Sequence, residues 1–407
     1  MVGVLIRNGA VGLIATVLLL GFASGGAEAG YKEKVLYSFK GGSDGSGPNT
    51  ALIMDSQGNL YGATIQGGSS GCNGAGCGTI FQVTPSGAET TLYSFKGRRD
   101  GTGPDGTLIA DAQGNLYGTT FSGGGRGSCE GGCGTVFEVT PQGSESVLYA
   151  FTGIADGGVP MGNLILDAHG NLYGTAKIGS FSPYGEVFEV TLQKKETVLY
   201  SFAGGTDGGH PNPGLITDSQ GNFYGTGDLG DHDGCGTGGC GTVFEVTPQG
   251  TETVLSTFAQ RKNGADPFGL IADARGHFYG TTEYGGSCTV YRFGCGVVFK
   301  VNAKGKETAL YSFANREDGA APVAGLLADA KGNFYGTTSF GGGSCGCGTV
   351  FKVTPKGEES VLHSFTGGSD GGFPEAALIA DSQGNLYGTT EAGGASGKGT
   401  VFELEKN

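Results

Sequence analysis

The chain has no tryptophan, only three methionines among its 407 residues, and few charged residues, 15% of the total. Without tryptophan, tyrosine and phenylalanine must supply the large aromatic surface of any core. No stretch has the apolar spacing of an amphipathic helix, which excludes a helical bundle. Proline is scarce, with 13 residues, and no strict three-residue period accompanies the 86 glycines, which excludes collagen.

Basic residues are also few. Lysine and arginine total 24 against 38 aspartates and glutamates, and the formal net charge is −14. The arginines after residue 29 are scattered along the sequence. Phosphate recognition needs a basic face, so we expect no nucleic acid among the partners.

One motif is present in seven copies. Residues 114–120 read Gly-Asn-Leu-Tyr-Gly-Thr-Thr, and the related segments begin at Gly58, Gly170, Gly221, Gly276, Gly332 and Gly384. Only the copy at Gly276 departs from Gly-Asn, with His277 in second place. A period of 51 to 56 residues is typical of a propeller or a solenoid.

Each repeat is predicted to contain four short strands. In the second copy these are 108–111, 115–120, 134–140 and 146–151, all rich in β-branched and aromatic residues and bounded by Gly, Pro or Asp. The sequence therefore predicts an all-β domain of four-stranded antiparallel units with tight turns.

The phase of the repeats distinguishes a closed ring from an open stack. Residues 33–39 have the pattern of a fourth strand, and residues 399–404 have the pattern of a third. The N-terminal strand therefore completes the last unit, which leaves no open sheet edge. We predict a single seven-bladed β-propeller over residues 30–407.

A glycine follows the tyrosine of the second strand in every copy, as in Gly118. Glycine inside a strand costs about 0.5–1 kcal/mol relative to alanine, so a close neighbour must require the space. We expect that neighbour to be an aromatic ring of the adjacent blade, with Phe137 and its equivalents the first candidates.

Three motifs recur in order: Leu-Ile-x-Asp-x-x-Gly-Asn-Leu-Tyr-Gly-Thr-Thr, Gly-Thr-Val-Phe-x-Val-Thr-Pro and Val-Leu-Tyr-Ser-Phe. Over residues 33–404 the chain resembles the exported bacterial tandem-repeat proteins named for Gloeobacter and Verrucomicrobia. The resemblance implies export and a repeat fold, and it brings no catalytic residues to transfer.

The N-terminus has the features of a cleaved secretory signal over residues 1–29. Arg7 precedes an apolar run from Val11 to Ala23, and Ala27-Glu28-Ala29 is a small-x-small cleavage site. The run is short for a membrane span, and no apolar run closes the C-terminus, so we expect a secreted or periplasmic protein without a transmembrane anchor.

Ten cysteines fall in five close pairs, each within one repeat. Even counts in an exported chain favour disulfides over zinc, since a four-thiolate site would need two pairs from different repeats. A single residue separates the last two, which leaves that pair the most strained. The predicted disulfide residues are Cys72 with Cys77, Cys129 with Cys133, Cys235 with Cys240, Cys288 with Cys295, and Cys345 with Cys347.

Two sets of aspartates recur in every repeat. They suggest rings of calcium ligands, but turn chemistry explains them better, because aspartate bonds nearby backbone and a scaffold position is the same in all copies. One set precedes Gly-x-x-Pro, with Asn263 in one copy: Asp44, Asp100, Asp156, Asp207, Asp318 and Asp370. The other begins hairpin turns: Asp55, Asp111, Asp167, Asp218, Asp273, Asp329 and Asp381.

Positions that differ between copies are better candidates for a binding site, and variable loops on a rigid scaffold often carry function. Two such positions are expected to face the channel mouth on the side of the long loops. The alternative is that they vary because nothing constrains them. The residues after Tyr-Gly-x-x are Ile65, Phe121, Lys177, Asp228, Glu283, Ser339 and Glu391, and those after the loop proline are Asn49, Asp105, Met161, Asn212, Phe268, Val323 and Glu375.

The fourth repeat has a loop rich in acids. Asp228, Asp231 and Asp233 surround His232, and His210 lies in the preceding loop. Asp-x-Asp-Gly is part of a Ca²⁺ loop, but the distal glutamate is missing, so a solvated acidic loop is the favoured interpretation and Ca²⁺ the alternative.

The sequence alone supports two functions. The first is a monomeric, non-catalytic propeller that binds a glycan, peptide or cell-surface partner through its long-loop face. The second is a lyase or hydrolase acting on a sugar or lactone with a divalent cation. The candidate ligand-binding residues are Lys177, Asp228, Glu283, Glu375, Glu391, Asp105, His210 and His232.

Overall fold

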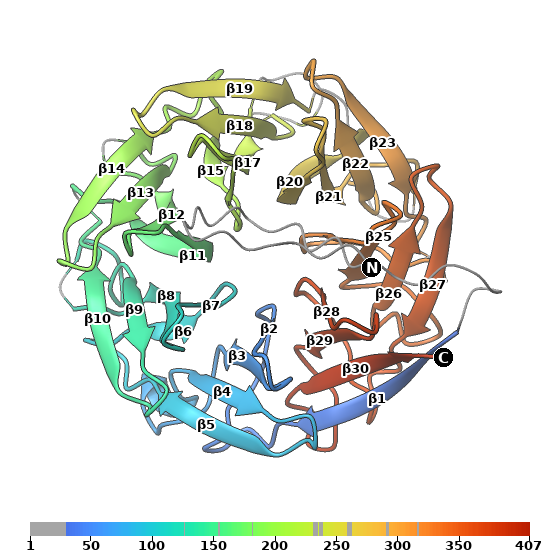
Figure 1. Cartoon of the computed structure of the whole chain (residues 1–407), viewed down its shortest axis with the longest axis horizontal. Coiled ribbons are helices and arrows are strands. Elements are labelled where there is room, and N and C mark those ends of the chain that lie inside the picture. The colour runs from blue at the N-terminus through green and yellow to red at the C-terminus, as the bar shows by residue number, and fades with distance from the viewer. Residues whose placement is uncertain are drawn as a thin grey trace, which may run out of the picture.

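The computed structural model describes residues 30–125, 127–153, 155–180, 182–230, 235, 239–258, 263–289, 293–315 and 317–407. Seven antiparallel sheets stand around a common axis (Figure 1). The predicted seven-bladed β-propeller is confirmed. The predicted signal segment 1–29 lies outside the described residues.

Each blade runs from an innermost strand at the channel to an outermost strand at the rim. The innermost strands are β2 (Ile53–Met54), β6 (Thr102–Pro104) with β7 (Ile109–Ala110), β11 (Gly158–Leu166), β15 (Gly209–Pro211) with β16 (Ile216–Thr217), β20 (Ala265–Ala272), β24 (Leu327–Ala328) and β28 (Ile379–Ala380). The second strands are β3 (Leu60–Thr64), β8 (Leu116–Ser122), β12 (Leu172–Ile178), β17 (Phe223–Leu229), β21 (Phe278–Tyr284), β25 (Phe334–Thr338) and β29 (Leu386–Thr390).

The third strands are β4 (Thr79–Val83), β9 (Thr135–Val139), β13 (Glu186–Val190), β18 (Thr242–Val246), β22 (Val297–Val301), β26 (Thr349–Val353) and β30 (Thr400–Lys406). The outermost strands are β5 (Glu89–Ser94), β10 (Glu145–Ala150), β14 (Glu196–Ser201), β19 (Glu252–Thr257), β23 (Glu307–Ser312), β27 (Glu359–Ser364) and β1 (Tyr31–Ser38). One short 3-10 turn, η1 (Cys72–Gly74), lies in a loop of the first blade. None of the helical segments in the described part of the chain is long and apolar enough to cross a membrane.

The ring closes as the repeat phase predicts. Strand β1 pairs antiparallel with β30, from Tyr31 opposite Lys406 to Ser38 opposite Thr400. The first strand of the chain therefore completes the seventh blade and lies beside its last strand (Figure 1).

Phenylalanine pairs join neighbouring blades. The phenylalanine after each outermost strand meets the third-strand phenylalanine of the next blade edge-to-face, with ring centroids 5.0–5.1 Å apart. All the rings in these pairs are buried. The pairs are Phe39–Phe81, Phe95–Phe137, Phe151–Phe188, Phe202–Phe244, Phe258–Phe299, Phe313–Phe351 and Phe365–Phe402.

The reason predicted for the strand glycine is half right. A Cβ on Gly118 would lie 2.7 Å from Cζ of Phe137 and 3.0 Å from a methyl of Leu108, so there is no room for a side chain. However, Gly118 is paired with Phe137 across β8 and β9. The crowding ring therefore belongs to the same blade and not, as predicted, to the adjacent one.

Both repeated sets of aspartates act as turn scaffolds, as predicted. Asp111 accepts hydrogen bonds from the backbone of Gln113 and Asn115, from the Asn115 amide and from the Tyr117 hydroxyl. His277 takes the place of this asparagine in the fifth blade, with Nδ1 2.8 Å from Asp273. All seven hairpin turns have this arrangement.

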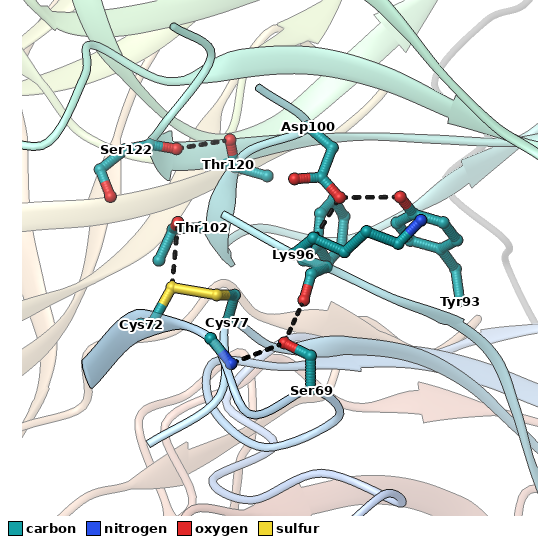
Figure 2. Close-up of a disulfide and its surroundings, with 11 residues drawn as sticks. Ser69, Cys72, Cys77, Tyr93, Lys96, Asp100, Thr102, Thr120 and Ser122 are labelled. Carbon is teal, nitrogen blue, oxygen red and sulfur yellow. Dashed lines mark hydrogen bonds between the residues drawn. A yellow bond between two sulfur atoms is a disulfide. The ribbon is translucent and has the colours of Figure 1, made fainter. Parts of the chain in front are cut away.

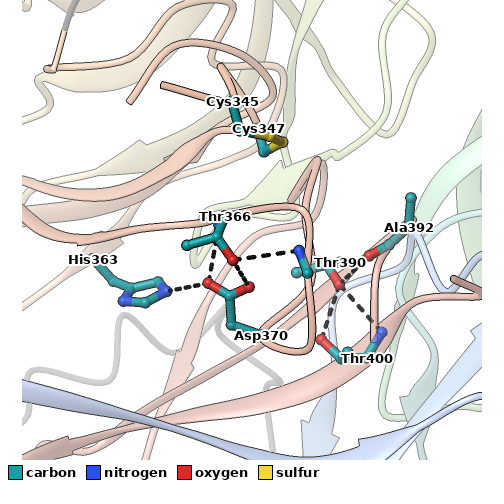
Figure 3. A network of polar contacts seen from close by, with 9 residues as sticks. Cys345, Cys347, His363, Thr366, Asp370, Thr390, Ala392 and Thr400 are labelled. Carbon is teal, nitrogen blue, oxygen red and sulfur yellow. Dashed lines mark hydrogen bonds and ion pairs between the residues drawn. A yellow bond between two sulfur atoms is a disulfide. The ribbon is translucent and has the colours of Figure 1, made fainter. Parts of the chain in front are cut away.

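The other set ties each outermost strand to the loop that follows it. In five blades a strand tyrosine donates to the loop aspartate, for example Tyr93 to Asp100 at 2.8 Å. In the sixth blade His363 replaces the tyrosine and its Nε2 lies 3.5 Å from Asp370 (Figure 3). In the fourth blade both partners change together, to Ser256 and Asn263.

Candidate functional site

The innermost strands enclose a channel to which all seven blades contribute. Its cavity has a volume of about 460 Å³. Six of the seven residues that follow the loop prolines line it, namely Asn49, Asp105, Met161, Phe268, Val323 and Glu375. Met161 and Phe268 lie within β11 and β20, because the innermost strand begins earlier than the sequence predicts. These side chains therefore form the channel wall itself.

The residue before each loop proline has a left-handed backbone in all seven blades. Five of these residues are not glycine, with φ of 47° to 59°: Val159, His210, Asp266, Ala321 and Phe373. Each backbone N–H donates to a carbonyl of the preceding blade, for example Asp266 to Cys240 at 3.0 Å and Phe373 to Cys347 at 2.7 Å. This bond fixes the strained conformation, which is typical of functional sites in proteins.

Disulfides brace the loops behind this ring. All five predicted pairs are bonded, including Cys345 with Cys347. In the first blade Cys72 Sγ lies 3.4 Å from the Thr102 hydroxyl of the next blade, and Ser69 donates to the carbonyl of Phe95 (Figure 2). The disulfide therefore holds the loop between the second and third strands against the loop that leads to the next blade.

Lys177 and Asp228 form the ion pair of the mouth. The Lys177 Nζ lies 3.7 Å from Oδ2 of Asp228. Asn212 donates its amide both to Asp228 and to the carbonyl of Pro267, which links the fourth and fifth blades. Burial raises the pKa of Asp228, and Lys177, Asn212 and His210 oppose that rise.

Two further carboxyl groups face Asp228 from the fifth blade. Burial, followed by the charges of Asp228 and Glu283, raises the pKa of Asp266 to about 7. Burial also raises the pKa of Glu283, and the Asp228 charge adds to the rise. Lys177 lowers both values, so this lysine acts on all three carboxyl groups.

The opposite side has carboxyl groups that form no ion pair in the described part of the chain. Burial, and then the charges of Glu391, Glu283 and Asp105, raises the pKa of Glu375 to about 7. Burial raises the pKa of Asp105 as well. Within the described ranges, no Lys, Arg or His nitrogen lies within 4 Å of the Glu375 or Glu391 carboxylate.

A second cavity of about 410 Å³ opens beside this acidic side. Phe340, Phe373, Glu375 and Glu391 line it. The two rings lie 5.9 Å apart, edge to face, and Phe340 is 42% exposed.

Six of the eight predicted ligand residues thus lie close enough to act on one another's charges. They are Lys177, Asp228, Glu283, Glu375, Glu391 and Asp105. His210 acts on Asp228 from the adjacent loop, and its ring nitrogen lies 3.3 Å from the Pro183 carbonyl. His232 lies outside the described residues. Their role in binding stays a prediction.

The predicted Ca²⁺ loop is only partly described. Asp231 and Asp233 lie outside the described residues, and Asp228 already contacts Lys177 and Asn212. Among the residues that the structure does describe, no three His, Cys, Asp or Glu side chains are grouped as metal ligands.

Sequence reasoning missed Asp266 and Phe373. Both precede the loop proline, and this position is Gly, Gly, Val, His, Asp, Ala and Phe along the seven copies. The residue type varies here as much as at the two candidate positions of each repeat. A residue before proline is expected to be extended and not left-handed, so sequence rules do not place it at the channel mouth.

The comparisons with known proteins agree with the fold. The sequence model of the Gloeobacter/Verrucomicrobia repeat matches residues 27–238 and 233–407. No match was found among curated proteins.

Two solved structures illustrate the likeness. Virginiamycin B lyase from Staphylococcus aureus, solved with quinupristin, has a TM-score of 0.60 at 12% identity, over 93% of this chain and 100% of that one. An extracellular domain from B. thetaiotaomicron has a TM-score of 0.56 at 12% identity, over 92% of this chain and 39% of that one. At these identities the likeness concerns the fold alone.

Proposed function

The chain belongs to the Gloeobacter/Verrucomicrobia repeat family, and from that premise we propose that it is an exported, non-catalytic propeller that binds a glycan, peptide or cell-surface partner at its channel mouth. One observation carries the proposal: the side chains that differ between repeats converge at the mouth, whereas those that repeat are used in turns and blade seams. A ligand without sevenfold symmetry needs such non-repeating contacts.

Several features support a rigid binding surface. The mouth residues stand at or near strand ends, and disulfides brace the loops of five blades, so little conformational freedom is lost when a ligand binds. The five disulfides also support an extracytoplasmic location, where such bonds persist. The signal segment predicted at 1–29 is part of the same proposal.

The test is a screen of glycans and peptides on the purified protein, followed by variants of the mouth. We expect at least one ligand class to bind saturably. A triple variant Lys177→Ala, Asp228→Ala and Glu283→Ala should weaken it. Lys304→Ala should not, because Lys304 lies in the turn between β22 and β23, on the opposite face of the propeller where the short hairpin turns lie, here called the tight-turn face. The single variants Glu375→Gln and Glu391→Gln extend the test to the other side of the mouth. If the triple variant and both single variants bind as well as the native protein, the ligand lies elsewhere and the proposal is refuted.

A second candidate is an enzyme, a lyase or hydrolase acting on a sugar or lactone with a divalent cation. Its support is that burial, and then neighbouring carboxylates, raise the pKa of Asp266 and Glu375 to about 7, which suits general acid–base catalysis at neutral pH. Virginiamycin B lyase has a similar fold, which adds only that a propeller can carry a lyase site.

Calorimetric titration with Ca²⁺ and Mg²⁺ separates the two candidates. The enzyme requires saturable cation binding at the mouth that the double variant Asp228→Ala and Glu283→Ala abolishes. Titrations without heat of binding for either cation would remove the cation-assisted enzyme and leave the binding module.

A further inference from the structure

We propose that the cavity lined by Phe340, Phe373, Glu375 and Glu391, here called the acid–aromatic pocket, binds an organic cation: the ammonium or guanidinium group of a basic peptide side chain. The inference rests on the proposed function and names the ligand class for one part of the mouth.

The pocket is built from three blades. Phe340 follows β25 of the sixth blade, Phe373 and Glu375 precede β28 of the seventh, and Glu391 follows β29. Ile65, after β3 of the first blade, also lines it. Segments more than 300 residues apart in the chain therefore form one cavity, and this requires the closed ring.

Among the described residues, nothing balances the charges in the pocket. Glu375 and Glu391 repel each other, and Glu283 and Asp105 add to the repulsion. Lys177 lies on the other side of the mouth and pairs with Asp228. An incoming cation would satisfy carboxylates that no described residue pairs with, whereas an anionic ligand would be repelled.

A buried hydroxyl lies beside one of these carboxylates. Ser339 is only 1% exposed, and its hydroxyl donates toward Glu375 and lowers the pKa of that carboxyl. A carboxylate can accept hydrogen bonds at about four lone-pair sites, so one serine hydroxyl leaves most of the capacity of Glu375 for a ligand. An ammonium group has three N–H donors and a guanidinium has five.

The aromatic walls select the kind of cation. The face of a phenylalanine ring attracts ammonium and guanidinium groups within about 6 Å. Phenylalanine supplies no ligand atom to a metal ion, so the walls favour an organic cation. The backbone of Phe373 has φ of 59° and donates to the Cys347 carbonyl, which fixes the point from which the ring extends before a ligand arrives.

The experiment uses a fluorescent tetralysine peptide, with tetraalanine and a neutral tetrasaccharide for comparison, at pH 8 and low salt. Anisotropy should show saturable binding of tetralysine. The double variant Glu375→Gln and Glu391→Gln should weaken it by about tenfold or more, the loss of two close charge partners. The matched control Glu358→Gln and Glu405→Gln changes the net charge equally at exposed positions and should alter the Kd by less than about twofold.

A neutral substitution tests the aromatic part. Phe340→Leu should weaken tetralysine binding by about threefold to tenfold, the usual range for one cation–π contact. Phe293→Leu is the control, since Phe293 is equally exposed at 42% but lies outside the pocket.

Three results would overturn the inference. Equal weakening by the two double variants would mean diffuse attraction to an acidic protein. Tetrasaccharide or tetraalanine binding without tetralysine binding would reject the cationic class and leave the proposed function intact. If tetralysine does not bind the native protein at all, the inference about an organic cation is rejected. The wider ligand screen then decides the proposed function by itself.

Discussion

The two faces of the propeller use carboxylates in opposite ways. On the tight-turn face, burial works against the charge of Asp273, but hydrogen bonds from the backbone and ring of His277 lower its pKa to about 2. At the mouth, burial and neighbouring charges raise the pKa of Asp266 and Glu375 to about 7. All three are carboxylates, but hydrogen-bond donors surround Asp273, whereas Asp266 and Glu375 are surrounded by apolar groups and by other carboxylates.

This difference separates scaffold from site. A turn that recurs seven times has its donors built in, so its aspartate is fully satisfied and has nothing left to offer a ligand. The mouth carboxylates stand at positions that do not repeat, and their donors are few. Unsatisfied buried carboxylates cost stability, and such a cost is typical of functional sites.

The largest expected effect comes from removing a phenylalanine at the contact between two neighbouring blades, here called the blade seam. Phe137→Ala removes a buried ring and its edge-to-face contact with Phe95. It should lower the free energy of unfolding by about 3–5 kcal/mol in urea denaturation. Phe121→Ala at the mouth, where the ring is 43% exposed, should cost less than about 1 kcal/mol. Equal losses would show that the seam does not hold the blades together.

The pH dependence of stability tests both classes of carboxylate at once. A carboxyl group whose pKa is raised in the folded state contributes its full stabilisation at a pH below its pKa in the unfolded chain. That stabilisation is lost as the pH rises through its pKa in the folded protein. Raised pKa values also occur in the outermost strands. Burial, and then the charges of nearby carboxylates, raise the pKa of Glu145 and Glu359 to about 7 and that of Glu196 to about 8.

Carboxyl groups with a lowered pKa, such as Asp273, act in the other direction. Their contribution to the free energy of unfolding is lost only as the pH falls toward 2. The free energy of unfolding should therefore be greatest near pH 4 to 5, and greater at pH 5 than at pH 8 by about 2 kcal/mol or more after allowance for solvent screening. Urea midpoints across this range measure it. A maximum at pH 7 or above would contradict the raised values.

A matched pair of amide substitutions compares the two faces directly at pH 8. Asp111→Asn removes the charge that receives four hydrogen bonds and should cost about 1–3 kcal/mol. Glu375→Gln removes a repelled carboxylate and should stabilise the protein by about 1 kcal/mol. At pH 5 the gain from Glu375→Gln should disappear, since the native residue is then protonated. If both changes had the same sign, the division between scaffold and site would fail.

Much of the fold was predictable from the sequence because the repeat fixes each turn and each strand. The seven copies of Gly-Asn-Leu-Tyr-Gly predict seven blades. Residues 33–39 have the pattern of a fourth strand and residues 399–404 that of a third, which predicted the closing pair β1 and β30. The cysteine pairs also followed from their spacing.

The candidate site was predictable only in outline. The ion pair of Lys177 with Asp228, and the cavity that Glu375 shares with Phe340, depend on blade curvature and side-chain direction, which repeat spacing does not contain. The start of the innermost strands and the left-handed residues before the prolines were missed because local rules favour a loop and an extended backbone there.

The smallest effect tests those left-handed residues. Val159→Gly should stabilise the protein by about 1 kcal/mol, because a β-branched residue at φ 55° is strained where glycine is not. Asp266→Gly relieves the same strain and also removes a carboxylate that repels Asp228 and Glu283, so its gain should be larger at pH 8 than at pH 5. The gain from Val159→Gly should not change with pH. Chemical denaturation of both variants at the two pH values separates the strain that all blades share from the charge that only the mouth carries, and a pH-independent gain in both would show that Asp266 is not part of the acidic cluster.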